Sequence, residues 1–278
     1  MDAVPAHFDH PADAAEFRRP AHRDGVELYR AHIVSHAFEP HAHDAFGLGA
    51  IESGAERYRY AGSEHLAGAG SLVHMNDDVL HTGQSATDEG WRYRMAYVAP
   101  AVVAEVTGTG GWHFDVATRH EPARAARVSA LLCTLWSSTT EPLAFDSTLA
   151  ELLDAFRPHV RQHGKPESSA EPAFGAVLDY LHAHLDQRLT LDELATVAGL
   201  SPFHFLRRFR ARHGATPQQM LMALRLDRAK RLLARGEPPA QVAAAVGLSD
   251  QAHLTRAFAR RYGTTPGRYQ RQVGPVAA

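Results

Sequence analysis

The sequence predicts an α+β protein of two domains: an N-terminal antiparallel β-barrel with flanking helices, followed by an all-α domain. Short β-prone runs separated by Gly, Asp and Asn turns occupy the region from Val26 to about Val98. The apolar residues then change to helical spacing. One helical phrase also occurs twice, as "AGLSPFHFLRRF" from Ala198 to Phe209 and as "VGLSDQAHLTRAF" from Val246 to Phe258.

Length and charge distribution also indicate two domains, since 278 residues are enough for two separate hydrophobic cores. Residues 1–170 hold 14 Lys and Arg against 23 Asp and Glu, a net charge of −9, whereas residues 171–278 hold 15 against 8, a net charge of +7. A basic domain joined to an acidic one indicates that the C-terminal part meets a polyanion.

Composition excludes some classes of protein. No run approaches the 18 or more apolar residues of a membrane helix, and the N-terminus lacks the apolar core of a secretion signal. We therefore expect a cytoplasmic protein with no membrane partner. The single cysteine, Cys133, has no partner for an internal disulfide, and its leucine neighbours predict a buried side chain.

The strands of the first domain are expected in "VELYRAHIVSHAF", "RYRYAG", "GSLVHM" and "WRYRMAYV". We place this barrel at residues 1–120. Two helices are expected after it, within residues 121–162, because Val128 to Leu135 and Leu149 to Val160 carry apolar side chains at helical spacing. These apolar stripes either cover the barrel of their own chain or pair with a second copy in a homodimer.

A linker is expected at residues 163–173, within "RQHGKPESSAEPA", which has no apolar period. The helical domain then covers residues 174–278. In each copy of the repeated phrase a short apolar helix reaches a glycine, Leu-Ser follows, and a second helix starts. Gly199 and Gly247 stand where a sharp turn uses positive φ. Thr190 with Glu193 has the spacing of a capping box, and Ser201 is a suitable N-cap. The pattern predicts a double helix-turn-helix.

The second helix of each unit has two distinct faces. Phe205 and Phe209, like Leu254 and Phe258, are four residues apart and are expected to point inward. Gln, Thr and Arg on the opposite face suit base edges in a major groove, although such polar residues are also common on solvated helix faces. The candidate DNA-binding residues are Phe203, Leu206, Arg207 and Arg210 in the first unit, and Gln251, Ala252, Thr255 and Arg256 in the second.

Several motifs in this region resemble the DNA-binding domain of the AraC/XylS family of bacterial transcription regulators. They are the two Gly-Leu-Ser turns, "RLDRAKRLL" between the units, and the closing "FARRYGTTPGRYQR". The resemblance implies double-stranded DNA as a partner, with two recognition helices in successive major grooves about 34 Å apart, and RNA polymerase as a possible further partner. Phe203 and Leu206 depart from a usual base-reading face, and thymine methyl groups are suitable partners for them.

Histidines are concentrated in the N-terminal part, where 12 of the 19 lie before residue 121. "EPHAHDAFGLGAIESG" places His41 and His43 on one face of a strand, and "GSLVHMNDDVLH" ends in His81. Together with the strand pattern, these residues resemble the cupin-like sensor barrel found in many regulators of the same family. A metal-binding cupin would add a glutamate near Gly47 and Leu48, and none is present there.

We therefore expect the barrel to hold a small polar effector rather than a metal. No cofactor is expected; the alternative is a divalent metal on His41, His43 and His81. Alternation along the strands adds aromatic candidates, although the sequence does not say which face of a strand points inward. The candidate effector-binding residues are His41, His43, Tyr58, Tyr60, His81 and Trp91.

These observations predict a ligand-responsive, DNA-binding transcription regulator without catalytic residues. A ligand in the barrel would act by binding one arrangement of the two domains better than another. Two alternatives remain open from the sequence. One is a metal-dependent cupin enzyme with an appended DNA-binding domain, and the other is a DNA-binding protein whose barrel serves only as a dimerisation scaffold.

Overall fold

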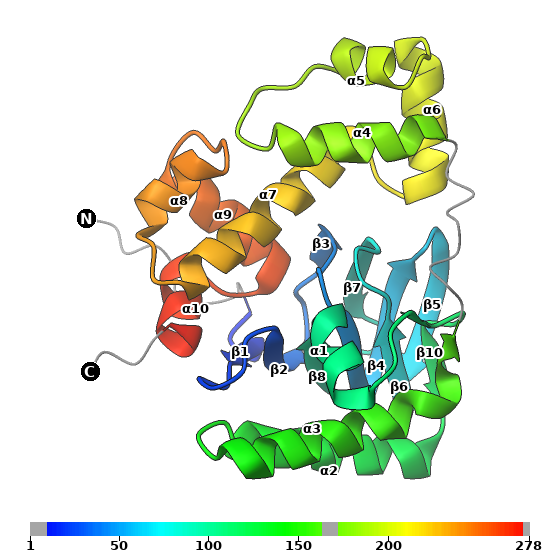
Figure 1. Ribbon diagram of the computed structural model, residues 1–278, viewed down its shortest axis with the longest axis vertical. Helices are drawn as coiled ribbons and strands as arrows, with labels where there is room; N and C mark the ends of the chain where they lie inside the picture. Colours follow the sequence, from blue (N-terminus) through cyan, green and yellow to red (C-terminus); the bar gives the residue numbers. More distant parts are fainter. Residues whose placement is uncertain (1–9, 163–171, 275–278) are drawn as a thin grey trace.

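The computed structural model describes residues 10–162 and 172–274 (Figure 1). The predicted linker, residues 163–173, therefore lies almost wholly outside the described residues. The first part of the chain forms antiparallel strands. Their bounds are β1 Ala14–Arg18, β2 Val26–Ile33, β3 Phe38–His41, β4 Phe46–Tyr60, β5 Ser63–Gly68, β6 Ser71–Met75, β7 His81–Ser85, β8 Trp91–Val98, β9 Trp112–His113, β10 Thr118–His120 and β11 Arg161–Gln162.

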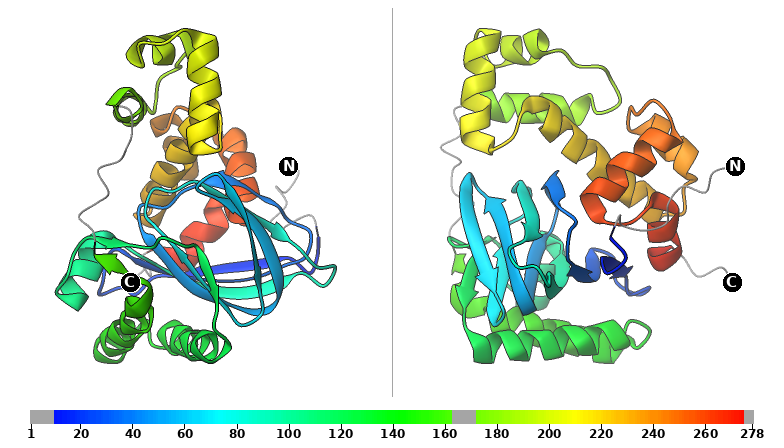
Figure 2. Two further views of the ribbon diagram at one scale, coloured as in Figure 1. Left: turned by 90° about the vertical axis from the view of Figure 1, so that its right-hand side faces the viewer. Right: turned by 180° about the vertical axis from the view of Figure 1, so that it is seen from behind.

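The main sheet has the strand order β1-β2-β8-β4-β6-β10, and the long strand β4 organises it. The first half of β4 pairs with β6 and β8, whereas its second half pairs with β5 and β7. The strands curve round into a cupin-like barrel, seen in the left view of Figure 2. Among the described residues no strand pairing joins β10 back to β1, so the predicted barrel is present but its hydrogen bonding does not close.

Alternation of side chains decides which residues enter the barrel. In β8, Trp91, Tyr93 and Met95 are buried, while Arg92 between them is exposed. In β4, Tyr58 and Tyr60 are likewise buried. The strands therefore expose their arginines and direct their aromatic rings inward, as expected for a sheet with one face in the core.

Helices close one end of the barrel. Helix α1 covers Pro100–Thr107, α2 covers Pro122–Ser137 and α3 covers Pro142–Phe156, followed by a short 3-10 turn η1 at Arg157–His159. The apolar side chains of α2 and α3 share one core with strands of the barrel, and Val128, Leu149 and Phe156 are fully buried. These stripes therefore cover the barrel of their own chain, and they are not free to pair with a second copy.

The prediction for Cys133 was wrong, because this thiol is exposed. Leu132 and Leu135 occupy the buried stripe of α2. Cys133 follows Leu132 by about 100° around the helix axis and so falls on the outer side.

The second part of the chain is helical. Its helices are α4 Pro172–Ala183, α5 Leu191–Val197, α6 Pro202–His213, α7 Pro217–Ala234, α8 Pro239–Ala245, α9 Gln251–Tyr262 and α10 Pro266–Val273. Helices α5 and α6 form the first helix-turn-helix and α8 and α9 the second, and the 18-residue α7 joins them (Figure 1). The capping box of Thr190 and Glu193 at the start of α5 is confirmed.

The two turns have the predicted backbone. Gly199 has φ +65° and Gly247 has φ +71°, values that L side chains rarely adopt. At Gly247 a side chain would also collide with the carbonyl oxygen of Asp186, which lies 2.7 Å from the position of a Cβ atom. The four residues predicted to point inward, Phe205, Phe209, Leu254 and Phe258, are all completely buried.

Both helix-turn-helix units lie against the open end of the barrel, opposite α2 and α3 (Figures 1 and 2). The second unit shares one continuous hydrophobic core with the barrel, in which Phe17 and Tyr29 of the barrel join Phe258 and Tyr269. The first unit has its own core, which Ala42 from the mouth of the barrel joins. Among the described residues no helix has the length and apolar character to cross a membrane.

Candidate functional site

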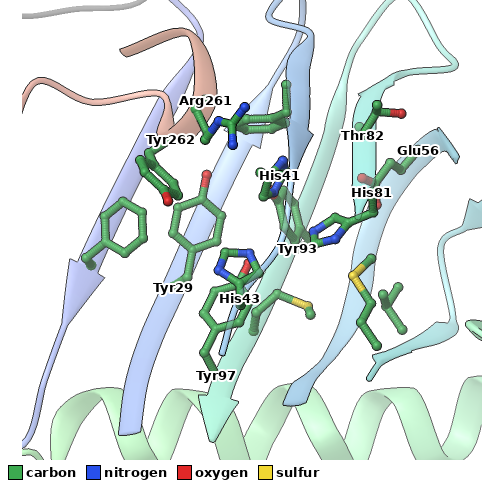
Figure 3. A pocket seen from close by; sticks show the side chains of 16 residues that line it. Tyr29, His41, His43, Glu56, His81, Thr82, Tyr93, Tyr97, Arg261 and Tyr262 are labelled. Carbon is green, nitrogen blue, oxygen red and sulfur yellow. The ribbon is translucent and has the colours of Figure 1, made fainter. Parts of the chain in front are cut away.

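A cavity of about 30 Å³ lies inside the barrel, at the end that faces the helical domain. Its wall comes mainly from β2, β3, β4, β7 and β8, which supply His41, His81 and several aromatic rings. Strands β1 and β6 add further apolar side chains, and helix α9 contributes Arg261 and Tyr262 (Figure 3). The cavity is therefore formed jointly by the barrel and by the recognition helix of the second unit.

The three predicted histidines meet in this cavity. His41 and His81 are opposite each other in the pairing of β3 with β7, and His43 follows β3 by two residues. Their ring centroids are 4.1 Å apart for His41 and His81, 5.2 Å for His41 and His43, and 5.3 Å for His43 and His81. One ring nitrogen from each lies within 4.8 Å of the others. All three side chains are buried.

Hydrogen bonds fix the tautomers of two of these rings. Nδ1 of His41 lies 2.8 Å from the carbonyl oxygen of Glu39, and Nδ1 of His81 lies 3.1 Å from that of Val79. Since a carbonyl only accepts, each Nδ1 carries the proton and donates it, which leaves Nε2 with a free lone pair. Nε2 of His43 is buried and has no hydrogen-bond partner among the described residues.

Burial keeps the three imidazoles neutral at pH 7. Desolvation, with the nearby charge of Arg261, lowers the pKa of His81 to about 4. Desolvation first, and then the neighbouring histidine and Arg261, hold the pKa of His41 well below its ordinary value. The pKa of His43 is lowered in the same way. The cavity therefore presents uncharged ring nitrogens rather than imidazolium groups.

The rest of the wall is aromatic, with one carboxyl group. Tyr93 and Tyr97 are contributed by β8, and burial raises the pKa of both hydroxyl groups well above the ordinary value. Burial also raises the pKa of Glu56 to about 8, so this side chain is protonated at neutral pH. Glu56 lies outside the group of three histidines whose nitrogens converge.

Arg261 is a buried cation in this wall. Its side chain is among the largest fully buried ones, with the residue 2% exposed, and desolvation lowers the pKa of the guanidinium. Nε and Nη1 have no hydrogen-bond partner among the described residues. A buried guanidinium with two unsatisfied nitrogens costs free energy, so its persistence here marks a position at which an anion would be stabilised.

A second buried cation fixes the helical domain to the barrel. Lys230 of α7 forms an ion pair with Glu27 of β2, and the hydroxyl of Tyr269 donates to the same carboxylate at 2.6 Å. Burial would raise the pKa of Glu27, but the charges of Lys230 and Arg19 and the hydrogen bonds hold it below its ordinary value. Lys230 also lies 4.7 Å from the ring centroid of Phe17. The second unit is thus anchored by a fully desolvated charge pair as well as by apolar contacts.

The structure places only half of the predicted effector residues at the cavity. His41, His43 and His81 line it, whereas Tyr58, Tyr60 and Trp91 do not, although all three are buried in the barrel. Other residues of the same strands, such as Glu56 of β4 and Tyr93 of β8, line the cavity instead. The hydroxyl of Tyr60 accepts a hydrogen bond from the backbone amide of Asn76 at 2.9 Å, which gives this ring a structural role.

Sequence reasoning missed several residues of the wall. Glu56 and Tyr93 alternate in phase with the residues that were chosen, so strand periodicity contained the signal for them. Arg261 was missed for a different reason. It follows Leu254 and Phe258 on one stripe of α9, and a charged residue in an apolar stripe is a weak sign of a buried contact.

The candidate DNA-reading face of α6 is accessible. Phe203 is 72% exposed, which is unusual for a phenylalanine, and Arg207 and Arg210 are exposed on the same helix. Leu206 is partly buried. The exposed ring and the two guanidinium groups project from a helix that begins directly after the turn at Gly199.

The corresponding face of α9 differs from the sequence prediction at one position. Gln251, Ala252 and Arg256 are exposed, but Thr255 is 8% exposed and its hydroxyl donates to the carbonyl of Gln251 at 2.9 Å. Thr255 lies three residues before Phe258 and seven before Tyr262, so it shares their buried stripe rather than the outer face.

A cleft of about 420 Å³ separates the first unit from the mouth of the barrel. Arg59 of the barrel lies on one side of it, and Arg210 and His213 of α6 lie on the other. The cleft and the barrel cavity share two wall residues, His81 and Thr82. It therefore adjoins the histidine cluster from the solvent side.

Two protein-family models match the chain. An AraC-like ligand binding domain matches residues 25–156, and a helix-turn-helix domain matches residues 194–272. The first match contains all strands of the cavity except β1 together with helices α2 and α3, and the second contains both recognition helices.

Relatives agree with these matches. The uncharacterized HTH-type transcriptional regulator YbfI of Bacillus subtilis is 29% identical over 237 residues, which cover 82% of this chain and 86% of the relative. The probable transcriptional regulator LumQ of Photobacterium leiognathi is 41% identical over 93 residues, covering 33% of this chain and 38% of its own length. Crystal structures of ToxT from Vibrio cholerae share the fold, one with a TM-score of 0.56 at 11% identity, covering 94% of this chain and all of the other.

Proposed function

Because this chain belongs to the AraC family of DNA-binding transcription regulators with an N-terminal ligand-binding domain, we propose that its barrel cavity senses the effector through α9. One observation carries the proposal: the wall of the cavity contains Arg261 and Tyr262 of the second recognition helix. A ligand in the cavity would touch the helix whose opposite face presents Gln251 and Arg256 to DNA.

Such a ligand discriminates between arrangements of the two domains. The full set of wall contacts exists only while α9 lies against the barrel, so a ligand that uses Arg261 binds the docked arrangement more tightly. Only such differential affinity shifts the equilibrium between arrangements. The barrel contacts both helix-turn-helix units, so docking also sets how α6 and α9 stand relative to each other, and with it the fit to two successive major grooves.

The size of the cavity limits the effector. Pockets for drug-sized ligands measure roughly 300–1,000 Å³, whereas this cavity has about 30 Å³. One structure of ToxT holds an unsaturated fatty acid, and a ligand of that size would not fit here without separation of the two domains. The docked arrangement therefore suits a very small ligand, and the adjoining cleft at His81 and Thr82 offers a route from solvent.

The proposal also covers the type of protein, its location in the cell and its partners. The relatives described above are transcriptional regulators, which favours a sensing barrel over a catalytic one. DNA as partner favours action in the cytoplasm. A homodimer would use surfaces other than the apolar stripes of α2 and α3, which are covered; Leu143 of α3 is 82% exposed and available. RNA polymerase is a further partner that we propose for this regulator.

Coupling can be tested without knowing the effector, because it is reciprocal: if the effector changes affinity for DNA, DNA changes the cavity. A binding sequence is first selected from randomised DNA. Hydrogen–deuterium exchange of the full chain is then compared with and without this DNA. We expect altered exchange in β3 and β7 around the histidines as well as in α6 and α9. A change confined to α6 and α9 would contradict the proposal.

The Arg261→Gln variant provides the matched comparison. It removes the charge that links α9 to the cavity while Gln251 and Arg256 remain in place, so the variant should still bind DNA but transmit a smaller change to β3 and β7. Arg212→Gln is the control, since Arg212 occupies the corresponding place at the end of α6 and is exposed.

A further inference from the structure

The three histidines of the cavity have the donor set of a metal site. Their tautomers leave Nε2 of His41 and His81 unprotonated, because each Nδ1 donates to a backbone carbonyl. Metal-binding histidines have this second hydrogen bond almost always, since it fixes the ring and raises its basicity. Nε2 of His43 is buried without a partner among the described residues, and one ring nitrogen from each of the three histidines lies close to the other two.

The spacing requires only a small adjustment. Ring nitrogens bound to one tetrahedral ion at roughly 2.0–2.1 Å lie about 3.3 Å apart, and here they lie within 4.8 Å of one another. The nitrogens would therefore have to approach one another by up to about 1.5 Å when an ion binds. The cavity, with a volume of about 30 Å³, has room for an ion with one small ligand, since a single water molecule requires only about 10–15 Å³ by a comparable measure.

Charge decides what completes the site. Three neutral imidazoles leave a divalent ion with its full charge, and Arg261 adds another positive charge to the same wall. Two positive groups in a dry cavity repel each other unless an anion lies between them. Nε and Nη1 of Arg261 lack partners among the described residues, so they are available to donate to such an anion.

We propose that His41, His43 and His81 bind a divalent transition-metal ion, and that a small anion on its open coordination position pairs with Arg261. Imidazole ligands suit zinc, nickel, copper and iron. Three protein ligands with one open position form a site that takes up an exchangeable ligand rather than a closed structural one. The inference rests on the proposed function, in that the metal with its anion is the ligand through which the barrel contacts α9.

The first test is a titration of the full chain, purified without a histidine tag and treated with chelator, with Co²⁺ as probe. We expect one Co²⁺ per chain, with the visible absorption of nitrogen ligation. His41→Gln, His43→Gln and His81→Gln should each weaken binding at least about 100-fold, since changes outside the ligand set alone cost 10–100-fold. The control is His120→Gln, because this histidine is exposed and lies outside the cavity.

Absence of stoichiometric binding by the wild-type chain would overturn the proposal, as would equal affinity in the three cavity variants and in His120→Gln. X-ray absorption of the Co²⁺-loaded wild-type chain decides the matter even if the variants do not fold. Three imidazole nitrogens at roughly 2.0–2.1 Å support the site, and fewer than three contradict it.

The anion is tested with azide added to the Co²⁺-loaded protein. Wild type should show a saturable change in the visible spectrum, and Arg261→Gln should need a concentration of azide at least ten times higher. Equal azide affinity in the two would remove Arg261 from the site. These measurements contain no DNA. Failure of metal binding with intact exchange coupling would thus reject only the metal, whereas metal binding without coupling would reject only the sensing role.

Discussion

The two helix-turn-helix units share a sequence pattern and a fold, yet they meet the barrel differently. Arg212 and Arg261 occupy the same place in the repeat, near the end of the recognition helix. Arg212 is exposed to solvent, whereas Arg261 is buried in the wall of the cavity. The duplicated pattern therefore specifies two equivalent helices for DNA, and contacts behind these helices decide which one responds to the barrel.

Anchoring differs as strongly as position. The second unit shares its core with the barrel and holds the buried pair of Glu27 and Lys230. The first unit has a separate core that Ala42 and Leu80 of the barrel join, and a polar cleft of about 420 Å³ lies beside that contact. The second unit is therefore held to the barrel by more buried contacts than the first.

The largest expected effect is on the free energy of unfolding, and it should differ between the core of the second unit and the core of the first. Phe258→Ala should lower the free energy of unfolding by about 3–5 kcal/mol, and it should do so for the barrel as well, because Phe258 and Trp91 belong to one core. Phe209→Ala removes an equally buried ring from the core of the first unit, to which the barrel contributes Ala42 and Leu80. Urea unfolding followed by tryptophan fluorescence checks this, since the three tryptophans lie in the N-terminal part. Equal loss of barrel stability in both variants would refute the distinction.

Breaking the buried ion pair of Glu27 and Lys230 should have the second-largest effect on stability. Glu27→Gln leaves Lys230 without its counter-ion, at a cost of about 3 kcal/mol; this is the lower end for broken buried pairs, because the new amide still accepts from Tyr269. Asp44→Asn is the control, since it breaks the exposed pair with Arg231 and should cost less than about 1 kcal/mol. Unfolding free energies in urea give both values, and similar losses would show that the buried pair is not the anchor.

The same pair predicts a dependence on pH. The folded-state pKa of Glu27 lies below its ordinary value of 4.5. Its stabilising contribution is therefore complete above that value and is lost as the pH falls through the folded-state pKa. Wild type should lose its advantage over Glu27→Gln in acid below about pH 4.5. An advantage that stays constant as the pH falls would contradict this assignment of the charge pair.

DNA recognition offers a smaller contrast between the units. Arg256 is exposed beside Gln251, and loss of a bidentate base contact costs about 1–3 kcal/mol and relaxes sequence preference. Arg207 stands near the exposed Phe203, so Arg207→Ala should weaken all sites alike and reduce the salt slope by about one. Selection from randomised DNA, with salt titrations, measures both effects. Unchanged base preference in Arg256→Ala would assign the reading of the second unit to Gln251 or to DNA shape.

The smallest expected effect on stability concerns Arg212 and Arg261, which occupy the same place in the two units. Arg261→Met removes a buried charge with two unsatisfied nitrogens and should leave the ligand-free protein equally stable or up to about 1 kcal/mol more stable. Arg212→Met, on the exposed helix end, should stay within about 0.5 kcal/mol. Thermal unfolding of the chelator-treated protein measures both. A clear loss of stability in Arg261→Met would mean that the guanidinium already has a protein partner.

Local patterns predicted the elements of the fold well. The turns at Gly199 and Gly247 and the inward phenylalanines depend on backbone conformation and helical period, which neighbouring residues determine. The convergence of His41, His43 and His81 followed from strand phase and a family resemblance. What the sequence did not contain was the docking of α9 on the barrel, because Arg261 meets the cavity through contacts between residues far apart in the chain.

The errors have the same physical origin. Thr255 and Cys133 each lie at the edge of an apolar stripe, where a difference of about 100° around the helix decides between burial and exposure. Tyr58 and Trp91 were candidates for the effector site and are buried in the barrel without lining the cavity. Which level of a barrel remains hollow depends on how all the strands pack together.

The length of α7 has a consequence for promoter architecture. Its 18 residues form a rod of about 27 Å, and Lys230 near one end is held by the barrel. Each residue added to such a rod would rotate one unit relative to the other by about 100°, while each base pair added to DNA rotates its grooves by only about 35°. Because the rod has a fixed length and a fixed rotation, a single extra base pair would move one groove out of line with its recognition helix, so operators for this regulator should tolerate base changes far better than insertions between their two contact regions.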